Sequence, residues 1–482
     1  MSIKREILSL YSPRLPHQLT YMLQASEYRT DAYMAWLMRT RDFSLVQHRR
    51  TLDRTKKAKL IEAFLSIGML LELLAGVALI VYGAITGGAS WSWEIGTALI
   101  MAYPFIWSYL VLLPLEFGRL LIVEPSQARR VKSSSATFNQ HPALKIAVAG
   151  SYGKTSMKEL LTTVIGAGKR VASTTANRNV AIEHAKFASR LDGKDDVLII
   201  EYGEGAPGDV AAFAKNTHPD MAIITGLAPA HLDRYKTMAK AGEDIFSLAE
   251  YLKGKSVYVN GDSEALKPFI KKDYSVYGQG GVGEWKVSAV KLSINGISFN
   301  LSNGKSKLNL ASKLLGRHQI GPLSLAAALG IKFGLTPTAV EDAIKNAEPY
   351  EHRMQPYNLH GAWIIDDTYN GNIDGIQAGT ELLKELEAKR KIYVTPGLVD
   401  QGKETEAVHL SLGKLVTAAA PDLVVLMQNS VTKYIMSGLT ESGYQGELKI
   451  VDDPLSFYSN LDSFVAAGDL VLMQNDWTDN YA

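Results

Sequence analysis

The sequence predicts an α/β fold preceded by an α-helical hairpin in a membrane, and three observations carry this prediction. Short β-branched runs alternate with helical stretches from about residue 145 onward, the pattern of a parallel sheet covered by helices. A glycine-rich loop, GSYGKTS at residues 150–156, joins one such run to a helix. Two long uncharged apolar runs, residues 73–93 and 95–115, lie upstream of this loop.

Composition narrows the class of protein. The chain has 482 residues, which suggests roughly three domains. Hydrophobic residues make up 46% and charged residues 21%, so disorder is not expected. A formal net charge of +2 gives no case for a nucleic-acid partner. The absence of cysteine excludes disulfides, Cys-ligated zinc and a Cys nucleophile.

The N-terminal region, residues 1–132, is predicted to hold two transmembrane helices at about 64–86 and 95–115. Both apolar runs reach the roughly 20 residues that a span requires, and Trp91 and Trp93 in the turn between them suit a membrane interface. Lys and Arg residues on both flanks predict that both ends lie in the cytoplasm. Two buried helices of a soluble domain are the alternative, and Glu72 favours it. The amphipathic stretch at residues 21–43 predicts an interfacial or packed helix.

Two α/β domains are predicted to follow, at residues 133–350 and 351–482. Residues 133–142, SSSATFNQHP, are typical of a polar linker. The first domain is predicted to contain the strands KIAVAG, RVAST, DVLIIEYG, MAIITGL and SVYVNGD. Residues 284–310 alternate polar and apolar side chains around Asn-Gly turns, which predicts antiparallel hairpins. The second domain is predicted to contain the strands AWIIDDT, KIYVTPG, DLVVLMQ, LKIVDD and DLVLMQ.

The glycine-rich loop has two residues between Gly150 and Gly153, where the common nucleotide loop has four. Its context still suits a phosphate cradle, because a strand precedes it and a helix N-terminus follows. Lys154 is predicted to reach the β- and γ-phosphates, and the Thr155 hydroxyl to ligate Mg²⁺. An ordinary tight turn with an exposed lysine is the alternative. The predicted phosphate-binding residues are Gly150, Ser151, Gly153, Lys154, Thr155 and Ser156.

Two further polar residues follow strands of the same domain. Glu201 ends the run DVLIIE, and His231 follows MAIITGL. Ligands of open α/β sheets bind at the carboxyl ends of the strands, so we expect both side chains near the loop. A hydroxyl, a carboxylate and an imidazole could hold Mg²⁺ there between phosphates and a substrate.

These segments resemble the Mur ligases, which are ATP-dependent enzymes that form amide bonds. The short loop is similar to the family's G-[ST]-x-G-K-[ST] pattern, and the similarity runs from about residue 145 to the C-terminus. The other matching segments are residues 174–183, 201–210, 314–330, 352–355, 364–376 and 395–409. Of these, IIDDTYNGNIDGI at 364–376 is similar to a signature of the D-alanyl-D-alanine-adding branch.

The resemblance implies a P-loop central domain and a Rossmann-like C-terminal domain. It implies a reaction in which a precursor carboxylate attacks the γ-phosphate of ATP and an amine displaces the resulting acyl phosphate. Lys154, Glu201 and His231 are implied to be catalytic, with Thr155, Glu201 and His231 holding Mg²⁺. The implied ATP contacts of the C-terminal domain are Arg353, Asp367 and Asn370. The implied substrate-binding residues are Asn177, Asn179, Asn372, Asp374 and His409.

The resemblance also implies partners and a location. The expected partners are a UDP- or lipid-linked cell-wall peptide precursor and an amino acid or dipeptide. The catalytic domains are expected on the cytoplasmic side of the cell membrane. Lys240 is the nearest match to a CO₂-modified lysine found in many relatives. Gln319 and Pro322 stand where the family pattern favours asparagine, and the hairpin replaces the usual UDP-binding domain.

Several alternatives share parts of this pattern. The chain could be a Mur-type ligase for a different polymer or a lipid-linked substrate, or an enzyme with folylpolyglutamate-type chemistry, against which DDTYNGN argues. An amide-forming homologue that works with a glutaminase subunit carries a Cys-rich zinc insert, and this chain has no cysteine. A nucleotide-binding membrane scaffold without ligase activity is the alternative from a different functional class.

Overall fold

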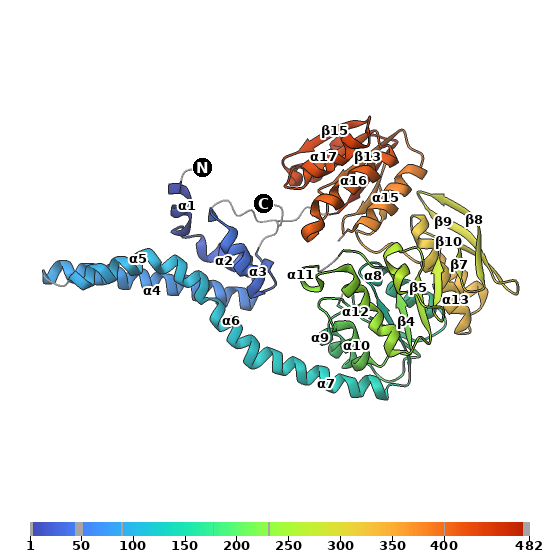
Figure 1. Cartoon of the computed structure of the whole chain (residues 1–482), viewed down its shortest axis with the longest axis horizontal. Helices are drawn as coiled ribbons and strands as arrows, with labels where there is room; N and C mark the ends of the chain where they lie inside the picture. Colours follow the sequence, from blue (N-terminus) through green and yellow to red (C-terminus); the bar gives the residue numbers. More distant parts are fainter. Residues whose placement is uncertain are drawn as a thin grey trace. The chain divides into compact units, whose positions relative to one another are not determined.

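The computed structural model describes residues 3–43, 52–87, 90–176, 178–229, 232–369, 371–399 and 401–475. The chain divides into two compact units, residues 1–129 and 130–482. Figure 1 shows them coloured along the sequence from blue to red.

The N-terminal unit is helical in its described residues. Its long helices α4 and α5 pack side by side as an antiparallel pair (Figure 1). A Cβ atom at Gly76 would lie 2.9 Å from the Gly96 carbonyl oxygen, and one at Gly83 would lie 2.3 Å from Ser92 Oγ. Small residues thus let the two backbones approach closely, as is common between membrane helices. The helices of this unit are α1 (Ile3–Leu10), α2 (Leu15–Ala25), α3 (Thr30–Arg39), α4 (Lys56–Thr86), α5 (Ser90–Leu110), α6 (Leu112–Gly118) and the π-helix η2 (Arg119–Val123).

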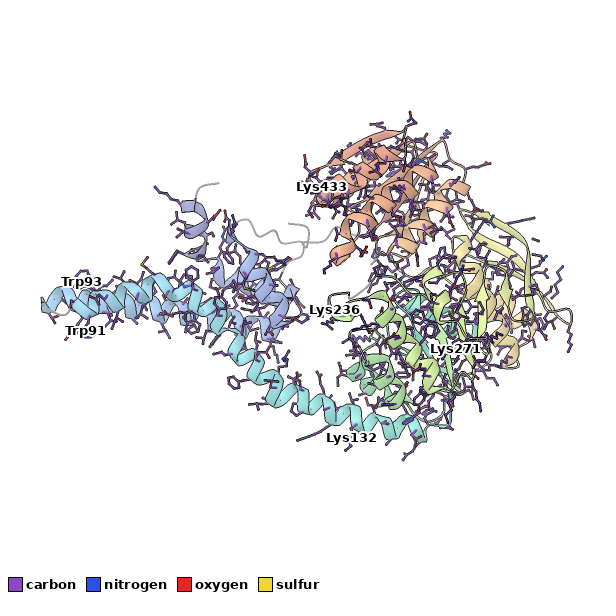
Figure 2. All side chains as sticks on the ribbon, in the orientation of Figure 1. Trp91, Trp93, Lys132, Lys236, Lys271 and Lys433 are labelled. Carbon is purple, nitrogen blue, oxygen red and sulfur yellow. The ribbon has the colours of Figure 1, made fainter. Side chains whose placement is uncertain are left out.

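The outward faces of α4 and α5 are apolar. Both α4 and the continuous helical stretch from Ser90 to Gln140 are long and apolar enough to cross a membrane. Their exposed apolar side chains include Leu70, Leu74, Val77, Val81, Ile85, Ile95, Met101 and Phe105. The predicted turn at residues 87–94 is too long, because α5 begins at Ser90. Trp91 and Trp93 therefore lie in its first turn, near the tip of the hairpin (Figure 2).

The base of the hairpin is packed by the preceding helices. Leu19 and Leu23 of α2 and Tyr33 of α3 form one core with Ile61 and Leu65 of α4. Residues 21–43 therefore contain packed helices. Within the pair, the Trp107 Nε1–H donates to Glu72 Oε2 at 2.7 Å, so this carboxyl has an internal partner.

The predicted polar linker at residues 133–142 is wrong, because α7 (Glu124–Gln140) continues through most of it. Phe138 is fully buried in the core of the second unit. The Asn216 side-chain amide donates to Ser134 Oγ at 3.1 Å. One buried aromatic ring and hydrogen-bonded serines hold a helix where composition alone indicated a loop.

The second unit begins with a ten-stranded sheet, in the order β10-β9-β8-β7-β6-β5-β4-β1-β3-β2. Strands β1 to β6 pair in parallel and β7 to β10 antiparallel. The predicted strands and hairpins are confirmed, and the structure joins both parts into one sheet through β6 and β7. The strands are β1 (Leu144–Ala149), β2 (Val171–Ser173), β3 (Val197–Glu201), β4 (Met221–Ile224), β5 (Val257–Asn260), β6 (Ser275–Gly278), β7 (Gly281–Val282), β8 (Trp285–Ser293), β9 (Gly296–Ser302) and β10 (Lys307–Ser312).

Helices cover both faces of the parallel part. Ile146 and Val148 of β1 pack against α8, α13 and α14, whereas Ala147 and Ala149 pack against α10 and α12. This alternation follows from the period of two along a strand. The helices are α8 (Lys154–Gly166), α9 (Ala181–Ala188), α10 (Asp209–Thr217), α11 (Leu232–Tyr235), α12 (Met238–Tyr251), η3 (Glu264–Phe269), η4 (Arg317–Gln319), α13 (Ile320–Lys332) and α14 (Pro337–Lys345).

A six-stranded sheet follows, in the order β11-β12-β16-β13-β14-β15. Its five predicted strands are confirmed. The antiparallel edge strand β11 was not predicted, because QPYNL begins with a polar residue and a proline. The elements are β11 (Gln355–Leu359), β12 (Ala362–Asp367), α15 (Ile373–Glu385), β13 (Arg390–Thr395), η5 (Gly402–Glu404), α16 (Thr405–Ala419), β14 (Leu423–Met427), α17 (Thr432–Glu441), β15 (Glu447–Val451), α18 (Pro454–Ser459), α19 (Leu461–Phe464) and β16 (Asp469–Gln474).

Candidate functional site

Three adjacent strands of the ten-stranded sheet end at one edge. Val148 of β1 pairs with Glu201 of β3, and Ala149 pairs with Ile224 of β4. The loop after β1, the carboxylate at the end of β3 and the segment after β4 therefore meet there. This is the edge at which open α/β sheets bind ligands.

The glycine loop lies tightly against the segment after β4. Gly150 has φ = 142°, and a Cβ atom there would lie 2.4 Å from Thr225 Oγ1. Ser151 N–H donates to the Gly226 carbonyl at 2.8 Å. Gly153, with φ = 74°, precedes α8, and no described side chain caps this helix. Its first-turn N–H groups thus remain available for an anion such as phosphate.

The first two residues of α8 each contact a carboxylate. Lys154 Nζ donates to Glu204 Oε2 at 2.8 Å and also to the Gly150 carbonyl. Thr155 Oγ1 donates to Glu201 Oε1 at 3.1 Å. Ser156 is half-buried in the same turn. The structure therefore brings the predicted Lys154, Thr155 and Glu201 together and adds Glu204, which the sequence analysis missed although it stands in the same EYGEG segment.

Glu201 is the most enclosed of these groups, with 1% of its surface exposed. Asn179 Nδ2 donates to Oε1 at 3.1 Å, so this predicted substrate-binding residue contacts the carboxylate. Lys158 Nζ lies 3.4 Å from Oε2. Oε2 itself is buried and has no hydrogen-bond partner among the described residues.

Lys158 is a second functional residue that the sequence analysis missed. It is fully buried one helical turn after Lys154, and its ammonium group donates to the Thr174 carbonyl at 2.8 Å and to the Ala176 carbonyl. It thereby ties α8 and Glu201 to the segment that leads to Asn177, a predicted residue that lies outside the described part of the chain. The signal for Lys158 in the sequence was a lysine at one of the apolar positions of α8.

His184 supports the backbone of the same strand end. Its Nε2–H donates to the Glu201 carbonyl at 2.8 Å. Burial lowers the pKa of His184 to about 4, so the ring is neutral at physiological pH. The group positions β3 and carries no charge into the site.

The loop after Glu201 is held from several sides. Asp209 Oδ2 accepts from Ala206 N–H at 2.8 Å, and Arg234 donates to the Gly205 carbonyl at 3.0 Å. The Tyr235 hydroxyl donates to Asp244 Oδ2 at 2.7 Å, and burial raises the pKa of Asp244. These contacts connect the loop that carries Glu204 to the α11–α12 region.

Two predicted residues next to this region remain without support from contacts. His231 lies outside the described residues. Lys240 is exposed in the first turn of α12, where its N–H donates to Thr237 Oγ1 at 3.3 Å. Nothing in the described structure connects its side chain to the carboxylates.

The residues present fit a magnesium ion. Thr155 Oγ1 and Glu201 Oε1 lie 3.1 Å apart, and Glu201 Oε2 is a buried oxygen that accepts no hydrogen bond from the described residues. Hydroxyl and carboxylate oxygens are the ligands that Mg²⁺ prefers, with waters and phosphates completing its shell. Among the described residues no three Asp, Glu or His side chains cluster as a metal site, so the fit depends on oxygens from phosphates.

The predicted residues of the C-terminal sheet form a second group. Asp367 ends β12 and accepts from Met354 N–H at 3.2 Å and from Gln474 Nε2 at 2.8 Å. Burial raises the pKa of Asp367 to about 7. The Arg353 guanidinium lies 4.7 Å from the ring centre of Tyr369, and its Nε is buried without a described partner. Asn370 lies outside the described residues.

Three predicted substrate contacts have internal partners. Asn372 caps α15 by accepting from Gly375 N–H at 2.9 Å. Burial raises the pKa of Asp374, which accepts a hydrogen bond from Tyr152 of the glycine loop. His409 is fully buried, accepts from Leu398 N–H at 2.9 Å and donates to the Thr405 carbonyl at 2.5 Å. Both of its ring nitrogens are engaged, so His409 holds a loop instead of a substrate.

Comparison with known proteins finds one matching family model and several similar ligases. Residues 148–330 match the family model "Mur ligase middle domain". The UDP-N-acetylmuramoyl-tripeptide–D-alanyl-D-alanine ligase of Escherichia coli is 27% identical over 315 residues, which are 63% of this chain and 69% of that protein. The ligase of the same name from Bacillus subtilis is 22% identical over 80% of this chain and 83% of its own length.

A solved structure shows the same fold. The MurF ligase of Thermotoga maritima in complex with ADP aligns with a TM-score of 0.65 at 20% identity, over 74% of this chain and 82% of that one. The matched middle domain contains the glycine loop, Glu201 and Glu204. The chain therefore contains a segment that matches the Mur ligase middle domain, and it is similar to MurF ligases in sequence and in fold.

Proposed function

We propose that this protein is an ATP-dependent carboxylate–amine ligase that extends a cell-wall peptide precursor. One observation carries the proposal. The uncapped N-terminus of α8 presents Lys154 and Thr155 beside two buried carboxylates at the ligand-binding edge of the sheet. This arrangement suits a phosphate group that enters with a divalent cation.

In the proposed complex the loop binds the phosphates of ATP. The N–H groups of residues 153–156 and the ammonium of Lys154 contact phosphate oxygens. Thr155 and Glu201 hold Mg²⁺, together with His231, whose role rests on its place in the sequence. When bound, Mg²⁺ neutralises phosphate charge. Asn179 at Oε1 and Lys158 at Oε2 keep the Glu201 carboxylate in position.

The reaction is a transfer followed by a displacement. An oxygen of the precursor carboxylate attacks the γ-phosphorus, the bond to the β-phosphate oxygen breaks, and ADP leaves. The amine of the incoming amino acid or dipeptide then attacks the acyl carbon and inorganic phosphate leaves, with loss of a proton from nitrogen. Positioning and charge neutralisation suffice for both steps, so no enzyme nucleophile is required.

The C-terminal sheet supplies the remaining nucleotide contacts in this proposal. The Arg353 Nε has no hydrogen-bond partner in the described part of the chain, and we assign it to a phosphate or ribose oxygen. Asp367 lies at the end of β12, and its raised pKa reflects a poorly solvated carboxyl that a hydrogen-bond donor or cation of the complex would stabilise. Asn370 is assigned to the same contact by its motif alone.

The names of the relatives suggest the substrates. Two of them act, by name, on UDP-N-acetylmuramoyl-tripeptide and D-alanyl-D-alanine, and we assign the same pair to this chain. Among the described residues predicted to bind substrate, Asn179 contacts the carboxylate of Glu201, a proposed metal ligand.

A membrane location of this chain bears on which form of the precursor it uses. The apolar outer faces of α4 and α5 and their glycine-lined interface support insertion as a hairpin, with the catalytic unit in the cytoplasm. This favours, as a second candidate, a lipid-linked form of the precursor.

Product analysis tests the proposal. We expect the purified full chain in detergent to release phosphate from ATP and Mg²⁺ only with both UDP-N-acetylmuramoyl-tripeptide and D-alanyl-D-alanine, and to form the pentapeptide product by mass. Lys154→Met should abolish turnover with the fold retained, whereas Lys169→Met, beyond the end of α8, should not. Turnover with the lipid-linked precursor but not with UDP-N-acetylmuramoyl-tripeptide would favour the second candidate. Nucleotide binding without turnover of any precursor–amine pair would indicate a scaffold and contradict the ligase.

A further inference from the structure

Glu204 holds the lysine that the proposed reaction needs for phosphate. Lys154 Nζ and Glu204 Oε2 lie 2.8 Å apart, and their side chains are 11% and 5% exposed. One helical turn further, Lys158 and Glu201 form a second buried pair at 3.4 Å. Lys158 also lies 3.1 Å from the carboxylate of Glu159, which is 42% exposed. Among the buried groups, two ammonium groups and two carboxylates therefore balance in charge when no ligand is present.

A bound nucleotide removes this balance. If Lys154 turns to the phosphates, Glu204 loses its described ionic partner while it stays enclosed. An unpaired buried carboxylate is strongly unfavourable, and the neighbouring phosphates add like charge. Glu204 then requires another cation.

A second observation shows where that cation would bind. Glu201 Oε2 is buried and accepts no hydrogen bond from the described residues. Glu201 ends β3 and Glu204 follows three residues later, and both reach the first turn of α8, at Thr155 and Lys154. The two carboxylates thus converge on the same turn.

We propose that Glu204 exchanges partners when the nucleotide binds. Without nucleotide it neutralises Lys154. With nucleotide it releases Lys154 to the phosphates and joins Glu201 and Thr155 in binding the divalent cation. The exchange makes and breaks only ionic contacts. The inference rests on the proposed function, since it requires a nucleotide in the loop.

Nucleotide and metal titrations on the full chain in detergent test the exchange. The probes are a non-hydrolysable ATP analogue, with or without chelator, and Mn²⁺ followed by electron paramagnetic resonance. In Glu204→Gln, Lys154 is free, so we expect the metal-free analogue to bind at least about threefold more tightly. Mn²⁺ should bind the nucleotide complex at least about tenfold more weakly, as expected for a lost ligand group. If Glu204 had a purely structural role, Glu204→Gln would weaken the binding of both the nucleotide analogue and Mn²⁺.

Further variants keep the test independent of folding. Lys154→Met leaves Glu204 without its lysine, so Mn²⁺ should bind this variant more tightly than wild type without nucleotide, and Lys154→Met/Glu204→Gln should lose that gain. Glu183→Gln is the control, because Glu183 pairs with Lys186 on α9 and is 18% exposed. It should change neither affinity.

The outcomes separate the two proposals. Wild-type nucleotide binding with unchanged Mn²⁺ affinity in Glu204→Gln would overturn the exchange and leave the ligase proposal intact. Loss of both affinities in Glu204→Gln, without the gain in Lys154→Met, would also overturn it. Absence of nucleotide binding by folded wild-type protein would overturn the proposed function itself.

Discussion

Asp367 illustrates how burial changes one side chain of the C-terminal group. Its carboxyl accepts hydrogen bonds from Met354 N–H and Gln474 Nε2, yet the loss of water outweighs them and raises its pKa to about 7. The folded state therefore binds this proton more tightly than the unfolded state, in which the pKa is 3.8. Its contribution to stability is fully present below about pH 4 and is lost as the pH rises through about 7.

We expect Asp367→Asn to remove this pH dependence. From pH 4 to pH 7 the wild type should lose free energy of unfolding relative to the variant, by at most about 1.4 kcal/mol per pH unit for one proton. Chemical denaturation at pH 5 and pH 7.5 measures the difference. The side-chain carbonyl oxygen of asparagine can still accept one of the two hydrogen bonds that Asp367 accepts. Asp462→Asn, at an exposed position, is the control, and a difference independent of pH would contradict the assignment.

At the scale of elements, the α4–α5 hairpin depends on small residues. A Cβ atom at Gly76 would lie 2.7 Å from Ile100 Cγ1 and 2.9 Å from the Gly96 carbonyl oxygen. The second contact is with backbone, which cannot move without separating the helices. Glycine is therefore the residue that the close approach of α4 and α5 allows at position 76.

Gly76→Leu should destabilise the hairpin by at least about 1–3 kcal/mol, the usual cost of overpacking. Gly118→Leu makes the same chemical change in α6, where nothing lies within 4 Å of the added Cβ, and should be tolerated. The measurement is the temperature at which half of the detergent-solubilised protein aggregates, read by size-exclusion chromatography. Equal temperatures for the two variants would show that α4 and α5 do not pack as described.

At the scale of the whole molecule, the exposed apolar faces of the hairpin allow a test of the proposed membrane location. Val77 and Val81 are 44% and 49% exposed on α4. In water, lysine at such positions is harmless or improves solubility. Inside a bilayer, each lysine costs roughly 2.5–3.5 kcal/mol on an insertion scale.

Val77→Lys/Val81→Lys should therefore move the protein out of the membrane fraction after a carbonate wash, or cause its degradation. Leu455→Lys replaces a somewhat more exposed apolar residue, at 56%, on α18, and should leave the fractionation unchanged. A soluble, stable double variant together with a soluble wild type would contradict insertion. Gly88, which lies between α4 and α5 in the sequence and outside the described residues, suits a topology reporter, which we expect to lie outside the cytoplasm.

The sequence by itself determined the classes of element and the place of the site. Period-two and β-branched runs specified thirteen of the sixteen strands closely enough to predict them, all apart from β6, β7 and β11, because burial of both sheet faces demands continuous apolar side chains. The glycine spacing and Lys154 located the loop, since a phosphate cradle tolerates few other residues. The family resemblance added the reaction.

Only the tertiary structure decided which side chains contact one another. Residues 133–140 are helical because Phe138 is buried in a core formed by residues distant in the sequence. No local sequence pattern encodes that burial. Contacts across 11 to 50 residues of chain engage both ring nitrogens of His409 and bring Glu204 and Lys158 into the site. Charged side chains are individually ambiguous in a sequence, because the same glutamate is a solvated surface group or a buried counter-ion according to what the fold places beside it.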